Sequence, residues 1–171
     1  MFRLGRLVVS LLVLLAVGLV AACSDSTGPT PIEVQPASLV LARGGIYCTP
    51  RPAAQASAWI GPAGGSIKAG RHELRFPQGS LSQGTLITMH VPSDTVNQVV
   101  FGPEGLLFPL GRHPTLKMDY KNCKFPVGAV RRIVYTDDDL RVQENVLTVD
   151  NLLTGEVGAR LKHFSRYAVM Y

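Results

Sequence analysis

The 171-residue sequence lacks the motifs on which many enzyme and metal sites are built. It has three cysteines, with no Cys-x-x-Cys pair and no Cys/His spacing typical of zinc ligands, so no metal site is expected. It has no Gly-x-Ser-x-Gly motif, and "GPAGG" (61–65) is followed neither by Lys-Ser/Thr nor by a helical pattern. We therefore expect no cofactor and no small-molecule substrate.

Dense runs of one charge are also absent. Lys and Arg number 17 and Asp and Glu 12, which gives a net charge of +5. Two of the basic residues, Arg3 and Arg6, lie in the first 22 residues, so the rest of the chain carries +3. This charge is too mild and too dispersed to favour nucleic acid as a partner.

One long apolar run is present, and it lies near the N-terminus. Residues 7–22, "LVVSLLVLLAVGLVAA", follow a short positive region and end directly before Cys23. The run has 16 residues, fewer than the roughly 20 that a membrane-spanning helix needs. Residues 1–22 are therefore predicted to be a secretory signal peptide.

The end of this run resembles the lipobox of bacterial lipoproteins. In "VAAC" (20–23) small residues precede Cys23, and the resemblance implies that Cys23 is acylated, begins the mature protein and makes the membrane a partner. An uncleaved anchor and a plain signal peptide with an incidental cysteine are the alternatives. In such lipoproteins Ser24 and Asp25 occupy the sorting positions, and an acidic residue in third rather than second place implies the outer membrane. The protein would then face the periplasm or the cell surface.

Two further cysteines, Cys48 and Cys123, remain after Cys23. An even number in a compartment that permits disulfides favours a Cys48–Cys123 bond over two buried free thiols. On the chain-entropy account, closing a loop of this length stabilises the fold by about 4 kcal/mol.

The composition divides the mature chain into a tether and one domain. Residues 24–31, "SDSTGPTP", are almost free of apolar residues, and 47–57, "YCTPRPAAQAS", are also typical of a linker. We therefore expect a tether over 23–57, with an extra strand over 32–43 as an open alternative, and a folded domain over 58–171.

The domain is expected to be all-β, an antiparallel β-sandwich or a partly closed barrel. Short alternating segments recur between glycines and prolines, and no window after the signal sustains helical periodicity over three turns. Gly70 and Arg71 separate two of these segments by a two-residue hairpin signal. The predicted strands are 65–69, 72–76, 85–91, 115–120, 130–136, 140–144, 156–164 and 166–171.

Three separated segments resemble the ZU-five domain of zonula-occludens proteins, netrin receptors and ankyrins. They are "GPAGGSIKAGRHELRFPQGSLSQGTLITM" (61–89), "FGPEGLLFPLGRHPTLKM" (101–118) and "LKHFSRYAV" (161–169), which occur in the order of the family. The resemblance implies a β-sandwich that serves as an interaction module and has a closing strand at its C-terminal end. The phenylalanines of these segments are expected to be core residues: Phe76, Phe101, Phe108 and Phe164.

The triplet "HFS" (163–165) offers one reaction. In some signalling proteins with ZU-five domains it is a self-cleavage site, which implies that Ser165 attacks the carbonyl of Phe164 with His163 as the base. A serine hydroxyl needs such a positioned base, and the peptide must be strained. The cut would release only residues 165–171, so packing of Phe164 is the simpler interpretation. We do not expect an enzyme.

The remaining polar candidates are weaker. His72, His90 and His113 share no metal-ligand spacing and are expected at the surface or half-buried. "TDDDL" (136–140) is expected to be a solvated turn rather than a calcium loop, and Glu104 has no paired carboxylate. The sequence thus predicts a lipid-anchored, non-enzymatic β-domain of the cell envelope, which contacts an envelope protein or another envelope component. Self-cleavage between Phe164 and Ser165 is the alternative.

Overall fold

The structure, a computed structural model, describes residues 44–171. The signal peptide, Cys23, the first part of the tether and the strand over 32–43 lie outside this range and stay predictions. Residues 44–171 contain no helix, and hence none that is long and apolar enough to cross a membrane.

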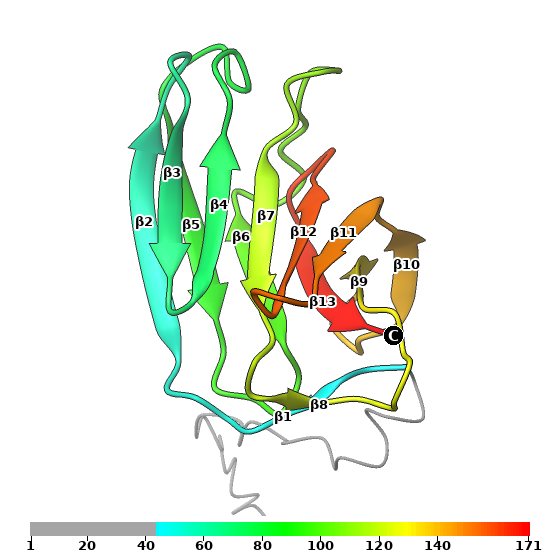
Figure 1. Ribbon diagram of the computed structural model, residues 1–171. Helices are drawn as coiled ribbons and strands as arrows, with labels where there is room; N and C mark the ends of the chain where they lie inside the picture. Colours follow the sequence, from blue (N-terminus) through cyan, green and yellow to red (C-terminus); the bar gives the residue numbers. More distant parts are fainter. Residues whose placement is uncertain (1–43) are drawn as a thin grey trace, which may run out of the picture. The chain divides into compact units, whose positions relative to one another are not determined.

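The described residues form thirteen β-strands, all paired antiparallel (Figure 1). One sheet has the order β10-β9-β13-β6-β5-β2, a second has the order β11-β12-β7-β4-β3, and β1 and β8 form a short ribbon. The bounds are β1 Tyr47–Cys48, β2 Ala54–Ile60, β3 Gly65–Ala69, β4 His72–Phe76, β5 Thr85–Val91, β6 Gln98–Gly102, β7 Thr115–Asp119, β8 Cys123–Lys124, β9 Arg132–Thr136, β10 Val142–Asn145, β11 Thr148–Asn151, β12 Glu156–Arg160 and β13 Arg166–Met170.

The two large sheets pack face to face around the larger of two buried hydrophobic clusters, and the smaller one consists of Val96, Val134, Leu140, Ala168 and Met170. In Figure 1 the five-stranded sheet lies in front of the six-stranded sheet. Leu74 of β4 and Leu116 of β7 belong to the same cluster as Ile87 and Met89 of β5, and all four side chains are fully buried. Both sheets keep open edge strands, so residues 44–171 form a sandwich without a closed barrel, which confirms the predicted all-β class.

The period-two pattern of the sequence explains why the central strands form. In β5, Ile87 and Met89 point into the core while Leu86 and His90 are exposed. Burying each such side chain contributes about 1.5–3 kcal/mol. The predicted hairpin between β3 and β4 is confirmed, because Ala69 pairs with His72 and Gly70 takes a positive φ of 56° in the two-residue turn.

An aromatic cluster fills one part of the core. The ring of Phe164 lies 4.9 Å from that of Phe101, 5.0 Å from Phe108 and 6.0 Å from Phe76, between ring centroids. All four rings are buried, as predicted. Edge-to-face and offset contacts of this kind add about 0.5–1.5 kcal/mol each beyond the area they bury.

The prediction that residues 47–57 are tether, with the domain starting at residue 58, is wrong. This segment supplies β1 and the first half of β2, and Gly45 already forms a β-bridge with Met170. The composition suggested a tether because the inward-facing side chains of β2 are small. Ala54, Ala56 and Ala58 pack against the core, while the residues between them are exposed. Alanine, glutamine and proline are equally typical of linkers.

Four other strands differ clearly from the sequence prediction, among them the two-residue strand β8, which was not predicted. The strand expected over 156–164 ends at Arg160, and His163 forms only an isolated bridge with Leu107. The strand β6 was not predicted because "QVVFG" is too short and too continuously apolar to show alternation. The strand β11 was not predicted because its four residues, "TVDN", are mostly polar.

The predicted disulfide is present between Cys48 of β1 and Cys123 of β8. The two cysteines are also register partners in the β1–β8 ribbon. The bond therefore joins the start of the described chain to the connection after β7, 75 residues later.

Candidate functional site

The "HFS" triplet lies in the loop between β12 and β13, where backbone hydrogen bonds hold it on both sides. The N–H of Phe164 donates to the carbonyl oxygen of Leu106 at 2.9 Å, and the N–H of Gly105 donates to that of Phe164 at 3.0 Å. The N–H of Phe101 donates to the carbonyl oxygen of Ser165 at 3.1 Å. Hydrogen bonds therefore hold the peptide between Phe164 and Ser165 against β6 and the segment that follows it.

The two side chains of the implied self-cleavage pair are not joined. Within residues 44–171, Ser165 Oγ makes no hydrogen bond to His163. The His163 ring lies edge-on to Tyr135 with 5.0 Å between ring centroids, and its Nε2 is 3.8 Å from Glu144 Oε2. Ser165 is buried and borders a separate hollow of about 220 Å³ that Glu104 and the Asp137–Asp138 turn also line.

The Phe164 carbonyl oxygen has a hydrogen-bond donor, as an acyl-transfer site needs, but His163 is not placed as a base for Ser165. The Gly105 N–H is placed to stabilise negative charge on the Phe164 carbonyl oxygen. Proton removal from Ser165 needs a base within hydrogen-bond reach, and His163 is turned toward Glu144 and Tyr135 instead. The burial of Phe164, with no exposed surface, agrees with a packing role.

A second cluster, which the sequence did not predict, is centred on Asp119 at the end of β7. Its carboxylate is only 4% exposed, yet three cations approach it. Arg51 Nη1 lies 3.1 Å from Oδ1, Lys121 Nζ lies 3.4 Å from Oδ2, and Arg71 Nη1 lies 3.9 Å from Oδ2. We call Arg51, Arg71 and Lys121 the cationic triad.

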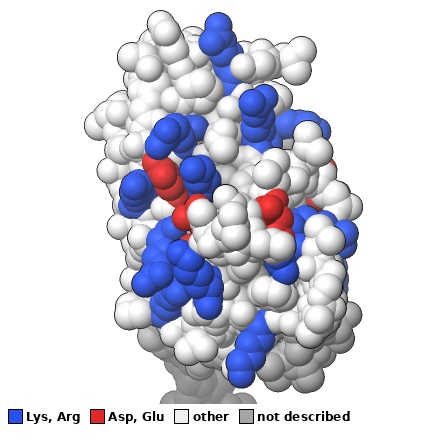
Figure 2. All heavy atoms as spheres, viewed as in Figure 1, with Lys and Arg blue, Asp and Glu red and all other residues white. Residues whose placement is uncertain are grey.

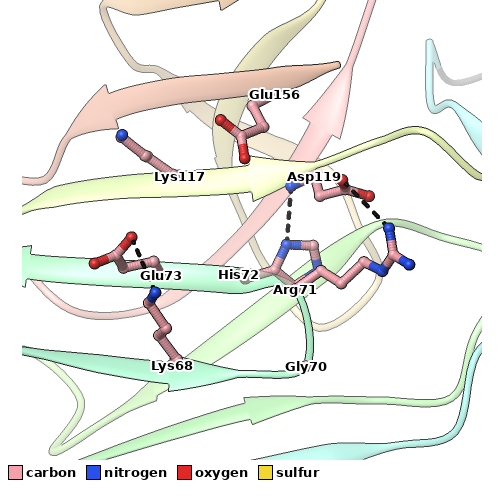
Figure 3. Close-up of a pocket in the computed structure, with 8 residues that line it drawn as sticks. All are labelled: Lys68, Gly70, Arg71, His72, Glu73, Lys117, Asp119 and Glu156. Atoms are coloured by element: carbon pink, nitrogen blue, oxygen red, sulfur yellow. Dashed lines mark hydrogen bonds and ion pairs between the residues drawn. The ribbon is translucent and has the colours of Figure 1, made fainter. Parts of the chain in front are cut away.

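The electrostatics of the cluster keep Asp119 charged and its neighbour His72 neutral. Burial raises the pKa of the Asp119 carboxyl, but hydrogen bonds from Arg51 and Lys121 outweigh it, so this pKa lies below its usual value. Burial lowers the pKa of His72 to about 4, with Asp119 opposing the shift and Arg51 adding to it. The backbone N–H of Asp119 donates to His72 Nδ1 at 3.2 Å, so the ring proton resides on Nε2 (Figure 3).

The cationic triad belongs to a larger basic surface, the outer side of the five-stranded sheet. Cross-strand pairing puts Arg75 and Arg160 on either side of Thr115, and puts Lys117 opposite Glu73. Figure 2 shows Lys and Arg side chains over this side, with few acidic atoms among them. We define the basic face as Arg51, Lys68, Arg71, Arg75, Lys117, Lys121 and Arg160, with the acidic residues Glu73, Asp119 and Glu156.

Two hollows adjoin on this face. One, of about 320 Å³, lies over the turn between β3 and β4 and is lined by the residues of Figure 3, from Lys68 to Glu156. The other, of about 510 Å³, runs along β11 and β12 and has apolar side chains, Leu147 and Val149, in its wall. Lys117 and Glu156 border both hollows, so charged and apolar surfaces meet there.

The turn between β11 and β12 carries the most exposed apolar pair of the sheet. Leu152 is 69% and Leu153 99% exposed. The side-chain oxygen of Asn151 accepts hydrogen bonds from the N–H groups of Leu153 and Thr154, at 3.1 and 3.2 Å, which fixes the turn. We call residues 152–155 the leucine turn.

The other candidates of the sequence form no site. His72 is buried rather than at the surface, whereas His90 is exposed and His113 is half-buried, each on a different segment. Asp137 closes the acidic turn by accepting from the N–H groups of Asp139 and Arg141, at 3.0 and 2.9 Å. No three His, Cys, Asp or Glu side chains among the described residues are grouped as metal ligands.

No family model matches the chain, and no curated protein is similar enough to match it. The Asp119 cluster was missed because its members are far apart in sequence and Arg51 lies in a segment expected to be tether. A signal was nevertheless present, because the alternation of "TLKMDY" places Lys117 and Asp119 on the same, outward side of a strand.

Proposed function

We propose that this chain is a lipid-anchored protein of the bacterial cell envelope, acylated at Cys23 and sorted to the outer membrane. Its β-sandwich is a non-enzymatic contact module of the ZU-five type that binds another envelope component. The lipobox-like "VAAC" supports the anchor. The three sequence segments and their order support the family.

The observation that carries the contact function is the outer side of the five-stranded sheet. There the basic face adjoins the exposed leucines of the leucine turn, and together they form a surface to which nothing in residues 44–171 is docked. Exposed apolar groups next to convergent charges are typical of interaction sites rather than of inert surface. By contrast, Ser165 and His163 are not arranged for self-cleavage, so we do not favour that alternative.

The anchor is tested by the variant Cys23→Ser. We expect a precursor that stays uncleaved and carries no acyl group, measured by intact mass and by incorporation of labelled palmitate. Normal processing of this variant would disprove the anchor without bearing on the contact surface.

The contact function is tested with a photoreactive side chain at position 153 of the full chain, in cells. Leu110 is the matched control, because it is also almost fully exposed, at 93%, but lies in the connection between β6 and β7. We expect a reproducible adduct, to protein or to lipid, from position 153 and none from position 110. Equal yields from both positions, or none from 153, would refute the proposed surface.

A further inference from the structure

The basic face holds the whole excess charge of the described chain. Residues 44–171 contain fourteen Lys and Arg and ten Asp and Glu, a net charge of +4. The basic face has seven cations and three acids, which is also a net charge of +4. The other residues of 44–171 therefore carry equal numbers of positive and negative side chains. Such a one-sided field attracts polyanions over a distance of about a Debye length.

The cationic triad has more donors than Asp119 can accept. The carboxylate already receives Arg51 Nη1 and the backbone N–H of Lys121 on the same oxygen, at 3.1 and 3.4 Å. Two guanidinium groups and one ammonium group bring more than ten N–H bonds, and a carboxylate offers about four acceptor positions. The remaining donors face solvent, since Arg71 and Lys121 are 59% and 52% exposed. Phosphate oxygens are suitable acceptors for such groups.

The leucine turn is in contact with this triad. The N–H of Tyr120 donates to the carbonyl oxygen of Gly155 at 3.0 Å, which ties the turn to the end of β7. Gly155 has a positive φ of 62°, and a Cβ there would lie 2.7 Å from Lys121 Cγ. The exposed side chains of Leu152 and Leu153 therefore lie on a turn whose last residue contacts Lys121 of the cationic triad.

We propose that the leucine turn and the cationic triad dock on the surface of an anionic lipid bilayer. Leu152 and Leu153 enter the boundary of the acyl chains, and the phosphates of the lipid head groups bind Arg51, Arg71 and Lys121. This deepens the proposed contact function by naming its partner. An exposed apolar turn beside a cationic triad suits a bilayer, which supplies an apolar layer below a layer of phosphates, better than it suits a folded protein.

The test uses the full acylated chain and the fact that its sequence has one tryptophan, Trp59. In a Trp59→Phe background, Leu153→Trp reports entry into the bilayer through quenching by brominated lipids, and Leu110→Trp is the positional control. We expect quenching at position 153 in vesicles of phosphatidylcholine with phosphatidylglycerol, but not at position 110. Removing phosphatidylglycerol or raising the salt concentration should weaken this quenching. The affinity for the bilayer should fall roughly fivefold for each cation that no longer contacts an anionic head group.

The charge requirement is tested with two matched double variants. Arg71→Gln with Lys121→Gln removes two cations of the triad, which are 59% and 52% exposed. Arg141→Gln with Lys162→Gln removes two cations elsewhere, which are 69% and 65% exposed. We expect the first pair to need more phosphatidylglycerol for the same quenching and the second to leave it unchanged. Unequal folding is excluded by requiring the same unfolding midpoint for both variants.

Three results would overturn the inference: no quenching at position 153 in either lipid, equal quenching without phosphatidylglycerol, or equal effects of the two double variants. If position 153 forms adducts with a protein in cells while Trp at this position stays unquenched, the contact function stands and the bilayer docking is wrong. Anchoring is measured separately, from the acyl mass on Cys23, so its failure cannot be confused with either result.

Discussion

The backbone N–H of Gly105 donates a hydrogen bond of 3.0 Å to the carbonyl oxygen of Phe164, the group that a self-cleaving Ser165 would attack. In isolation this contact resembles one half of an oxyanion hole. The neighbouring bonds, from Phe164 N–H to Leu106 and from Phe101 N–H to Ser165, show that it belongs to a ladder that holds the loop against β6 and the segment after it. The hydrogen bond from Gly105 to Phe164 is therefore explained by the packing of this loop, without a catalytic role.

We predict that the bond between Phe164 and Ser165 stays intact. His163 interacts with Glu144 and Tyr135 and makes no hydrogen bond to Ser165 Oγ, so the hydroxyl is not paired with the histidine that would have to take its proton. Intact-mass measurement of the purified protein should show one species, with no loss of the last seven residues, and Ser165→Ala should differ only by the mass of one oxygen. A fraction of cleaved wild-type chain that disappears in Ser165→Ala would contradict this.

Phe164→Ala should destabilise the domain by about 3–5 kcal/mol, because it leaves a cavity among three other aromatic rings. Urea unfolding of the purified chain measures the loss. Leu110→Ala is the control, since this side chain is almost fully exposed and its removal should change stability by less than about 0.5 kcal/mol. Equal losses in the two variants would show that the aromatic cluster is not the centre of the core.

The sequence predicted the parts of this fold in which local pattern and tertiary environment agree. In β3, β4 and β5 each alternate residue faces the core, so periodicity alone gives the strand and its buried side. The strand β2 could not be found this way, because its inward residues are alanines whose burial depends on the neighbouring β5. Tertiary pairing, rather than local propensity, makes this segment a strand.

The candidate sites show the same division. The motif "HFS" was visible in the sequence, but only the structure shows that its His and Ser point to different neighbours. The cationic triad has no motif at all, because Arg51, Arg71 and Lys121 reach Asp119 from three separate connections. Charge clusters that are assembled across strands need the register of the sheet, which one sequence does not specify.

We predict that His72 makes stability depend on pH between about 6.5 and 4. Its pKa is about 4 in the folded chain and 6.5 in the unfolded chain, so unfolding takes up a proton in this window and stability falls as the pH falls. The full shift corresponds to a loss on the order of 3 kcal/mol. Asp119 contributes in a lower window, below its ordinary pKa of 3.8, where protonation removes its ion pairs.

Unfolding midpoints of wild type and His72→Asn, measured at a series of pH values, check this prediction. Asparagine retains an acceptor for the N–H of Asp119 but does not titrate, so the slope between pH 6.5 and 4 should flatten. His90→Asn, at an exposed position, should keep the slope of wild type. If the unfolding midpoint of His72→Asn falls with pH as steeply as that of wild type, groups other than His72 cause the pH dependence.

Arg131 and Asp150 form a buried ion pair. Among the ion pairs of residues 44–171, replacing one partner of this pair should lower the free energy of unfolding the most. Arg131 Nε lies 2.7 Å from Asp150 Oδ2 as an ion pair without hydrogen-bond alignment, and both side chains are largely buried, at 7% and 13% exposure. The hydroxyl of Tyr120 donates to the other oxygen of Asp150 at 2.6 Å, and the guanidinium carbon lies 4.4 Å from the centroid of the Phe125 ring. Arg131→Met should therefore cost about 3–5 kcal/mol, because it leaves a buried carboxylate with one neutral donor.

The double variant Arg131→Met with Asp150→Asn should recover part of this loss, since neither charge then remains buried alone. A double-mutant cycle read by urea unfolding should give a coupling of about 2–3 kcal/mol. The pair Arg141 and Asp139, 3.6 Å apart and about two-thirds exposed, is the control and should couple by less than about 1 kcal/mol. If the buried pair couples no more strongly than this exposed one, then the rings of Tyr120 and Phe125, rather than Asp150, hold Arg131 in the interior.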